Sequence, residues 1–162
     1  MSGKQAEWRV LFVCMGNICR SPTAEGMLRK RLADEGLEAS VDVDSCGTGA
    51  WHIGEPPDAR AIRAAAERGI DLSALRGRQL DVEDFAVHDE ILVMDSDNLQ
   101  RVMALQPDGC RARVSRLLRY AGEPDRDVPD PYFGGDAGFQ RVLDLIEASV
   151  DGLMMALRQR LG

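Results

Sequence analysis

The sequence predicts an α/β domain in which helices cover both faces of a parallel sheet. Three observations lead to this fold class. Val10 to Cys14 form a continuous apolar run, which is typical of a strand buried on both faces of a parallel sheet. Segments with strand and helix patterns alternate along the rest of the chain. The length of 162 residues fits one domain, so we expect residues 1–162 to form a single domain.

The first half of the chain supplies two strands and two helices. Ser21 and Pro22 are residue types suited to the N-cap and the first position of a helix, and Gly36 is suited to end it. Apolar and polar residues alternate from 41 to 45, which predicts a half-buried strand. We expect a second helix over residues 58–68.

The second half repeats this alternation. Residues 91–94 form a short apolar strand, and Asp95 or Ser96 is suited to cap the helix that follows. A fourth strand around residues 113–115 is weakly marked. The last helix has the clearest pattern, an apolar stripe at helical spacing made of Phe139, Val142, Leu143, Ile146, Val150, Leu153, Met154 and Leu157.

The charge balance argues against several kinds of partner. The chain has 20 Lys and Arg against 27 Asp and Glu, a formal net charge of −7. Nucleic acids and anionic membranes attract basic surfaces, so we expect neither as a partner. The polar amino terminus and the short apolar runs predict a cytoplasmic protein without a signal peptide or a membrane span.

The cysteines point to thiol chemistry rather than to metal binding. Cys14, Cys19, Cys46 and Cys110 form no C-x-x-C motif, and the chain has only two histidines. A zinc site and a disulfide scaffold are both unexpected on this pattern, so we expect no metal and no cofactor. We interpret the thiols as buried or reactive groups in a reducing compartment.

The segment from Cys14 to Ser21 has the composition of an anion-binding loop. Gly16 permits positive φ and Asn17 tolerates it, so backbone N–H groups can point inward beside the positive end of a helix. Arg20 can bind two oxygens of a tetrahedral oxyanion. A thiol in such a field ionises readily, and the Ser21 hydroxyl is placed to hydrogen-bond its sulfur. The pattern predicts a cysteine nucleophile that attacks phosphorus.

Spacing alone supports this interpretation weakly, because a cysteine and an arginine separated by five residues also occur by chance. In the alternative, Cys14 is a buried strand end and Arg20 is a surface residue. The cysteine ends a predicted buried strand and the arginine opens a predicted helix, and this context favours the catalytic interpretation.

The segment VLFVCMGNICRSPTAEG resembles the signature of the low-molecular-weight protein tyrosine phosphatases. The stretches DSCGTGAWHIGEPPDARA, RGIDLSALRGRQL and PDPYFGGDAGF also match that family in order, so the resemblance covers nearly the whole chain. It implies a three-layer domain with a four-stranded parallel sheet flanked by helices, a phosphate-binding loop after the first strand, and no metal. The implied reaction is hydrolysis of phosphotyrosine in proteins through a phosphocysteine intermediate.

The resemblance also assigns roles to residues. Cys14 becomes the nucleophile, Arg20 the phosphate-binding arginine, Ser21 the hydroxyl that stabilises the thiolate, and Asp130 the general acid. The remaining loop residues, which surround the phosphate, are Met15, Gly16, Asn17, Ile18 and Cys19. Asn17 is implied to hold the loop in a strained conformation, with Ser45 as its hydrogen-bonding partner.

The general acid rests on the resemblance alone. Asp125, Asp127 and Asp136 lie near Asp130, and the pattern of the residues does not choose among them. A loop rich in proline and glycine is a suitable place for a mobile acid, and Pro131 favours an extended backbone at Asp130.

The implied substrate is a tyrosine-phosphorylated protein, and the loop is expected to bind phosphate and other tetrahedral oxyanions. Trp51, Tyr132 and Phe133 resemble the aromatic walls of the family, with Met15 and Ile18 lining the floor and sides. Such a slot is deep enough for phosphotyrosine to reach the thiol, whereas phosphoserine is too short. We expect the protein to be a monomer.

Two related activities use a similar loop. Thioredoxin-coupled arsenate reductases relay a disulfide to cysteines near the middle of the chain, and this sequence has none between Cys46 and Cys110. Protein-arginine phosphatases typically carry threonine at the position of Ile18, whose larger side chain suits a flat phenol better than a guanidinium. Arginine phosphatase is therefore the alternative enzymatic activity.

Two interpretations from other classes are less favoured. A catalytically silent phosphotyrosine-binding module would have lost Cys14, Arg20 or Asp130, and all three are present. A cysteine protease needs a histidine base. His52 lies in the expected rim of the site and His88 before a strand, and we interpret both as structural or exposed.

Two further positions concern the loop itself. The family usually has a histidine that supports the loop where this chain has Leu75, which predicts a reduced hydrogen-bond network around Asn17.

Cys19 matches the second loop cysteine of the family. It is either a small buried residue or a partner for a reversible disulfide with Cys14 that protects the thiolate from over-oxidation.

Overall fold

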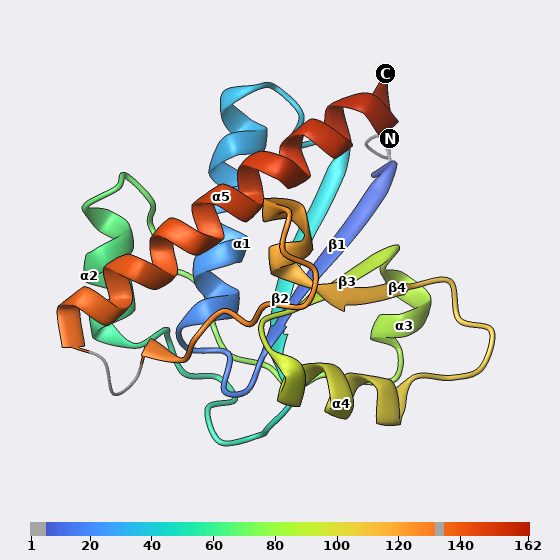
Figure 1. The fold of residues 1–162 in the computed structure, drawn as a ribbon, viewed down its shortest axis with the longest axis horizontal. Coiled ribbons are helices and arrows are strands. Elements are labelled where there is room, and N and C mark those ends of the chain that lie inside the picture. Colours follow the sequence, from blue (N-terminus) through green and yellow to red (C-terminus); the bar gives the residue numbers. More distant parts are fainter. Residues whose placement is uncertain (1–5, 132–134) are drawn as a thin grey trace.

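The computed structural model describes residues 6–131 and 135–162. Within these residues, four parallel strands form one sheet in the order β2-β1-β3-β4, which confirms the predicted fold class (Figure 1). The strands are β1 (Trp8–Cys14), β2 (Val41–Gly47), β3 (Glu90–Val93) and β4 (Arg113–Arg116). The helices are α1 (Arg20–Asp34), α2 (Ala59–Ala66), α3 (Asp84–Val87), α4 (Ser96–Leu105), the 3₁₀ helix η1 (Leu117–Ala121) and α5 (Gly135–Leu161).

Helices cover both faces of the sheet and make it the middle of three layers. Val10 and Phe12 of β1 enter the core formed with α1 and α5, whereas Leu11 and Val13 enter the core formed with α3 and α4. All four of these side chains are fully buried. The continuous apolar run of β1 therefore follows from its position as a central strand with no solvent-exposed face.

The predicted elements are present, with boundaries shifted by a few residues. Asp95 caps α4 by accepting a hydrogen bond from the backbone N–H of Asn98 at 2.8 Å. Asp58 caps α2 through Arg60 N–H in the same way. The short helices α3 and η1 were not predicted, because four or five residues are too few to show a helical period.

The parallel arrangement places the carboxyl ends of β1 and β3 at one edge of the sheet. The loop after β1, the loop after β2 and the segment before α5 approach one another there, which is where α/β folds bind their ligands (Figure 1). In the described part of the chain, no helix combines the length and apolar character needed to cross a membrane.

Candidate active site

Cys14 is the last residue of β1, and its side chain is buried beneath the loop of residues 15–19. Its Sγ atom lies 2.9 Å from the Ser21 hydroxyl and accepts a hydrogen bond from the backbone N–H of Asn17 at 3.3 Å. Helix α1 begins directly after this loop, at Arg20. The sulfur therefore lies among hydrogen-bond donors and near the positive end of a helix.

The loop is fastened to the residues that follow β2. Thr48 N–H donates to the Cys14 carbonyl at 2.9 Å, and Gly49 N–H donates to the Met15 carbonyl at 3.0 Å. Gly47 has no room for a side chain, because a Cβ atom there would lie 2.7 Å from the Met15 carbonyl oxygen. The close approach of two backbones thus fixes the first half of the loop.

Asn17 organises the interior of the loop. Its φ of 58° lies in the left-handed region, and its amide nitrogen donates to Ser21 Oγ at 2.8 Å and to Ser45 Oγ at 3.0 Å. The Asn17 Oδ1 atom accepts from the backbone N–H of Arg78 at 3.0 Å. Ser45 in turn donates to buried Glu25 at 2.6 Å. These bonds hold a backbone conformation that an asparagine would otherwise rarely adopt.

The network around Asn17 is well populated, contrary to the reduced network predicted from Leu75. Leu75 packs against the hydrophobic core, and the backbone N–H of Arg78 supplies the donor to the asparagine oxygen. Asn17 therefore has a partner for each side-chain polar atom without a histidine in this stretch.

One local prediction from the sequence was wrong. Ser21 does not cap α1, because the helix already begins at Arg20 and the serine hydroxyl turns toward Cys14 instead. The sequence allows positive φ at Gly16 or at Asn17, and in the structure it falls on Asn17. The small size of Gly16 serves packing, since a Cβ atom there would lie 3.1 Å from Cδ2 of His52.

Arg20 is buried, and its guanidinium is held by Asp95 and by the Val128 carbonyl. Its Nη1 atom donates to Asp95 Oδ2 at 2.7 Å and to the carbonyl of Val128 at 2.9 Å. Burial alone would lower the pKa of Arg20, but Cys14 and Asp95 raise it above its ordinary value, so the guanidinium stays charged. Its Nε and Nη2 atoms make no hydrogen bond within residues 6–131 and 135–162 and remain for an oxyanion.

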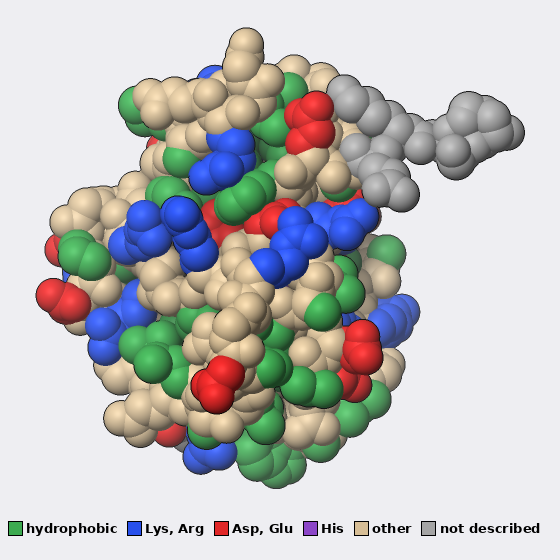
Figure 2. Space-filling view, turned by 90° about the vertical axis from the view of Figure 1, so that its right-hand side faces the viewer, with side chains coloured by type: hydrophobic (Ala, Val, Ile, Leu, Met, Phe, Trp, Pro, Cys, Tyr) green, Lys and Arg blue, Asp and Glu red, His purple; other side chains and the backbone are tan. Residues whose placement is uncertain are grey.

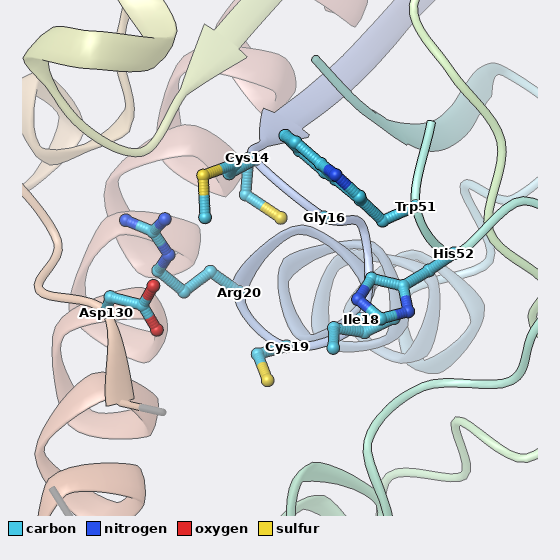
Figure 3. A pocket seen from close by; sticks show the side chains of 9 residues that line it. Cys14, Gly16, Ile18, Cys19, Arg20, Trp51, His52 and Asp130 are labelled. Carbon is cyan, nitrogen blue, oxygen red and sulfur yellow. The ribbon is translucent and has the colours of Figure 1, made fainter. Parts of the chain in front are cut away.

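A cavity of about 340 Å³ opens above the Cys14 thiol. Its lining residues are Cys14, Met15, Gly16, Ile18, Cys19, Arg20, Trp51, His52 and Asp130. Figure 3 shows Asp130 on the opposite side of the cavity from Trp51 and His52, with the Arg20 guanidinium beside the aspartate. Three segments far apart in the sequence thus contribute to one site.

The substrate walls predicted from the sequence are placed only in part. Trp51 is 67% exposed at the mouth of the cavity, and Met15 and Ile18 line it. Tyr132 and Phe133, the other predicted walls, lie outside the described residues. His52, interpreted from the sequence as structural or exposed, lines the cavity and lies 3.2 Å from Glu55.

Sequence reasoning also missed the two residues that hold the site from behind. Asp95 was predicted only as a helix cap, and no role was predicted for Glu25. Asp95 uses one oxygen to cap α4 and the other to hold Arg20. Nothing in the local sequence pattern indicates this second contact, because the partners are 75 residues apart.

Cys19 lies in the same cavity but in a different environment from Cys14. Burial, with smaller contributions from Asp58, Cys14 and Asp130, raises the pKa of Cys19 to about 12. Both thiols are free, and Figure 3 shows the Cys19 sulfur directed away from that of Cys14. At neutral pH, Cys19 is therefore a neutral thiol in this conformation.

Known proteins are similar to this chain in both sequence and fold. Residues 9–161 match the family model described as low molecular weight phosphotyrosine protein phosphatase. A low molecular weight protein-tyrosine-phosphatase from Streptomyces coelicolor is 42% identical over 158 residues, covering 94% of this chain and 95% of that protein.

Solved structures agree with this match. The crystal structure of YfkJ from Bacillus subtilis is similar with a TM-score of 0.88 at 36% identity, covering 98% of this chain and 99% of that one. The crystal structure of a Drosophila arginine phosphatase has a TM-score of 0.84 at 31% identity, covering 91% and 96%. Because the family model spans nearly the whole sequence, the chain belongs to the low molecular weight phosphotyrosine protein phosphatase family.

Proposed function

We propose that this protein hydrolyses phosphotyrosine in proteins in two steps, through a phosphocysteine formed at Cys14. The observation that carries the proposal is the convergence of the Cys14 thiol, the Arg20 guanidinium and the Asp130 carboxyl group on one cavity (Figure 3). These groups supply a nucleophile, a clamp for the phosphate oxygens and a proton donor.

In the first step, the Cys14 thiolate attacks phosphorus on the side opposite the phenolic oxygen. The S–P bond forms, the P–O bond to the phenol breaks, and protonated Asp130 gives its proton to the departing oxygen. Nε and Nη2 of Arg20 bind non-bridging oxygens of the phosphate, together with backbone N–H groups of the loop. Asp95 and the Val128 carbonyl hold the guanidinium in place before the substrate arrives.

In the second step, the Asp130 carboxylate takes a proton from water as the water oxygen attacks phosphorus. The P–S bond breaks, its electron pair returns to Cys14, and phosphate leaves. Ser21 stabilises the released thiolate by donating a hydrogen bond to it. Because the Asn17 amide donates to Ser21 Oγ at 2.8 Å, the hydroxyl hydrogen of Ser21 is available for the sulfur at 2.9 Å.

The shape of the cavity supports an aromatic phosphate ester as substrate. The buried Cys14 thiol and the exposed Trp51 ring line the same cavity, together with Ile18 and Met15. We expect a phenyl ring to bridge the buried thiol and the exposed indole, whereas the short side chain of phosphoserine leaves its phosphate too far from Cys14. We also infer that Tyr132 and Phe133 form the second aromatic wall.

Arginine phosphatase is the second candidate, because a Drosophila arginine phosphatase has the same fold at 31% identity. The substrate would again be a phosphate group on a flat, extended side chain. Ile18 in the lining disfavours it, since an aliphatic side chain offers no hydrogen bond to a guanidinium.

Parallel turnover measurements with phosphotyrosine and phosphoarginine peptides test both candidates. We expect wild-type protein to prefer phosphotyrosine and Cys14→Ser to lose turnover of both while still binding vanadate at Arg20. Ile18→Thr is expected to shift the ratio of the two kcat/KM values toward phosphoarginine. Faster turnover of phosphoarginine by the wild type would establish the second candidate, and substantial turnover by Cys14→Ser would contradict the nucleophile.

We infer that residues 1–162 act as one catalytic domain, as a monomer in the reducing cytoplasm. The four cysteines are free thiols, which suits a reducing compartment. The family match over residues 9–161 and the shared cores around one sheet support a single domain.

A further inference from the structure

A second cavity lies at the end of the sheet opposite the active site. The strands β1, β3 and β4 begin there with Trp8, Glu90 and Arg113, close to the last turns of α5 (Figure 1). The cavity has a volume of about 480 Å³, which exceeds the 340 Å³ of the active-site cavity. Pockets of this size accommodate small ligands, and the phosphatase mechanism makes no use of this one.

Three arginines line the second cavity: Arg113, Arg119 and Arg160. None of them has a carboxylate partner within 4.0 Å in the part of the chain that the structure describes. Most other arginines of the described residues pair with a carboxylate, as Arg158 does with Glu35 at 2.6 Å, whereas Arg63, Arg76 and Arg141 do not. Because carboxylates outnumber basic residues 27 to 20, three unpaired guanidinium groups around one hollow are unexpected in a surface arranged only for solubility. Figure 2 shows Lys and Arg side chains in a band across this side of the molecule.

Two of these guanidinium groups are oriented by aromatic rings. The Arg160 guanidinium carbon lies 3.8 Å from the centre of the Trp8 ring, and that of Arg119 lies 5.2 Å from the centre of the Tyr120 ring. A guanidinium stacked on a ring keeps its N–H donors in its own plane, where a ligand can reach them. The rings thereby limit the entropy that the arginines lose when they bind.

Glu90 fixes the two rings and leaves the cavity positively charged. Its carboxylate is buried and accepts hydrogen bonds from Trp8 Nε1 at 3.1 Å and from the Tyr120 hydroxyl. Burial and this contact with Glu90 raise the pKa of Tyr120 above its ordinary value, so the phenol stays neutral. The described lining therefore carries three positive charges against one negative charge, which is already satisfied by hydrogen bonds.

We propose that this cavity binds a small ligand that carries a diphosphate group. Arginine forks match phosphate oxygens in pairs, and these three arginines come from three elements, β4, η1 and α5, around a hollow of about 480 Å³. Two linked phosphates span more of this hollow than one phosphate does, and they carry negative charge to each of the three guanidinium groups. The source is free pyrophosphate or a nucleoside diphosphate, which share this chemistry.

The two tryptophans of the chain allow the two cavities to be observed separately. The chain has 2 tryptophans, of which Trp8 lines the second cavity and Trp51 lines the active site. We would therefore follow their two indole N–H signals by NMR during titrations of the intact protein with phosphate, pyrophosphate and ADP. Trp51→Phe assigns the signals.

We expect pyrophosphate to move the Trp8 signal saturably and to bind there at least about tenfold more tightly than phosphate, as an added charged contact predicts. Tighter binding of ADP than of pyrophosphate supports a nucleoside diphosphate, and weaker binding supports free pyrophosphate. No saturable movement of the Trp8 signal at millimolar pyrophosphate would overturn the proposal.

Matched variants locate the ligand. Arg113→Gln, Arg119→Gln and Arg160→Gln should each weaken the Trp8 titration by about tenfold and leave the Trp51 titration unchanged. Arg141→Gln, an exposed arginine on the first half of α5, is the control and should change neither titration. All three lining arginines are exposed, so their substitution leaves the core intact. Equal binding in all four variants would show general ionic attraction and refute the site.

Discussion

At the scale of single residues, Asp130 and Asp127 lie three positions apart but in different surroundings. Asp130 lines the active-site cavity beside Arg20. Asp127 accepts hydrogen bonds from the Ser96 hydroxyl and lies 3.2 Å from Arg116, on the outside of the molecule. The geometry therefore supports a choice between the two aspartates that the sequence could not make without the family resemblance.

The assignment of Asp130 as the general acid predicts how substitution changes the dependence of kcat on the leaving group. In Asp130→Asn the departing phenolate receives no proton, so kcat for substrates with a poor leaving group should fall by roughly 10²–10⁴. Substrates with an activated leaving group should lose much less. The measurement is kcat against the pKa of the leaving phenol, and the slope should become steeper in the variant.

Asp127→Asn is the control for this experiment. It removes the same charge from the same segment but only loosens the contact with Arg116, so the dependence on the leaving group should match that of the wild type. A steeper slope in Asp127→Asn, with little change in Asp130→Asn, would show that Asp127 and not Asp130 is the general acid.

At the scale of elements, the long helix α5 rests on η1 through a glycine. A Cβ atom at Gly152 would lie 1.8 Å from the Tyr120 carbonyl oxygen, a separation that only a backbone shift can relieve. The glycine therefore sets how closely α5 approaches η1. That approach also brings Tyr120 and the end of α5 together around the second cavity.

Gly152→Ala should lower the free energy of unfolding by about 1–3 kcal/mol, because overpacking forces the two elements apart. Urea unfolding measures the change. Gly138→Ala, in the same helix, is the matched control. A Cβ atom at Gly138 would lie 3.8 Å from its nearest neighbour, the Pro131 carbonyl oxygen, which is an ordinary contact. There the better helix propensity of alanine should leave stability unchanged or raise it by up to about 1 kcal/mol. Similar losses in both variants would mean that the close contact with Tyr120 is not what excludes a side chain.

At the scale of the whole molecule, the sequence predicts those features that have a period or a short spacing. Buried strands and amphipathic helices repeat within a few residues, so the layers of the fold could be predicted. The Cys14 and Arg20 pair belongs to one loop and was visible for the same reason. The contacts of Asp95 with Arg20 and of Glu25 with Ser45 join distant segments, which no local pattern encodes.

A partly buried charge cluster links β2, Arg78 and α3, and its charges make the stability of the molecule depend on pH. Arg78 donates to both carboxylate oxygens of Asp84, at 3.0 and 2.8 Å, and lies 2.9 Å from Asp44 of β2. Burial on its own would raise the pKa of Asp84, but the bonds from Arg78 and the Asp81 N–H outweigh it and hold the pKa below its usual value. Ionised Asp84 is therefore bound more favourably in the folded chain than in the unfolded chain.

Because the pKa of Asp84 is lowered in the folded chain, we expect its contribution to the free energy of unfolding to be lost in acid. Asp84 contributes its full stabilisation above the unfolded pKa of about 3.9, and the contribution is lost as the pH falls through the lower folded value. Asp84→Asn should cost about 1–3 kcal/mol at neutral pH, from lost charged hydrogen bonds, and the difference from wild type should shrink in strong acid. Urea unfolding at a series of pH values measures both. Asp97→Asn breaks only an exposed pair with Arg101 and should cost less than about 1 kcal/mol. A difference between Asp84→Asn and wild type that stays constant from neutral pH into strong acid would mean that Asp84 is not held ionised by Arg78.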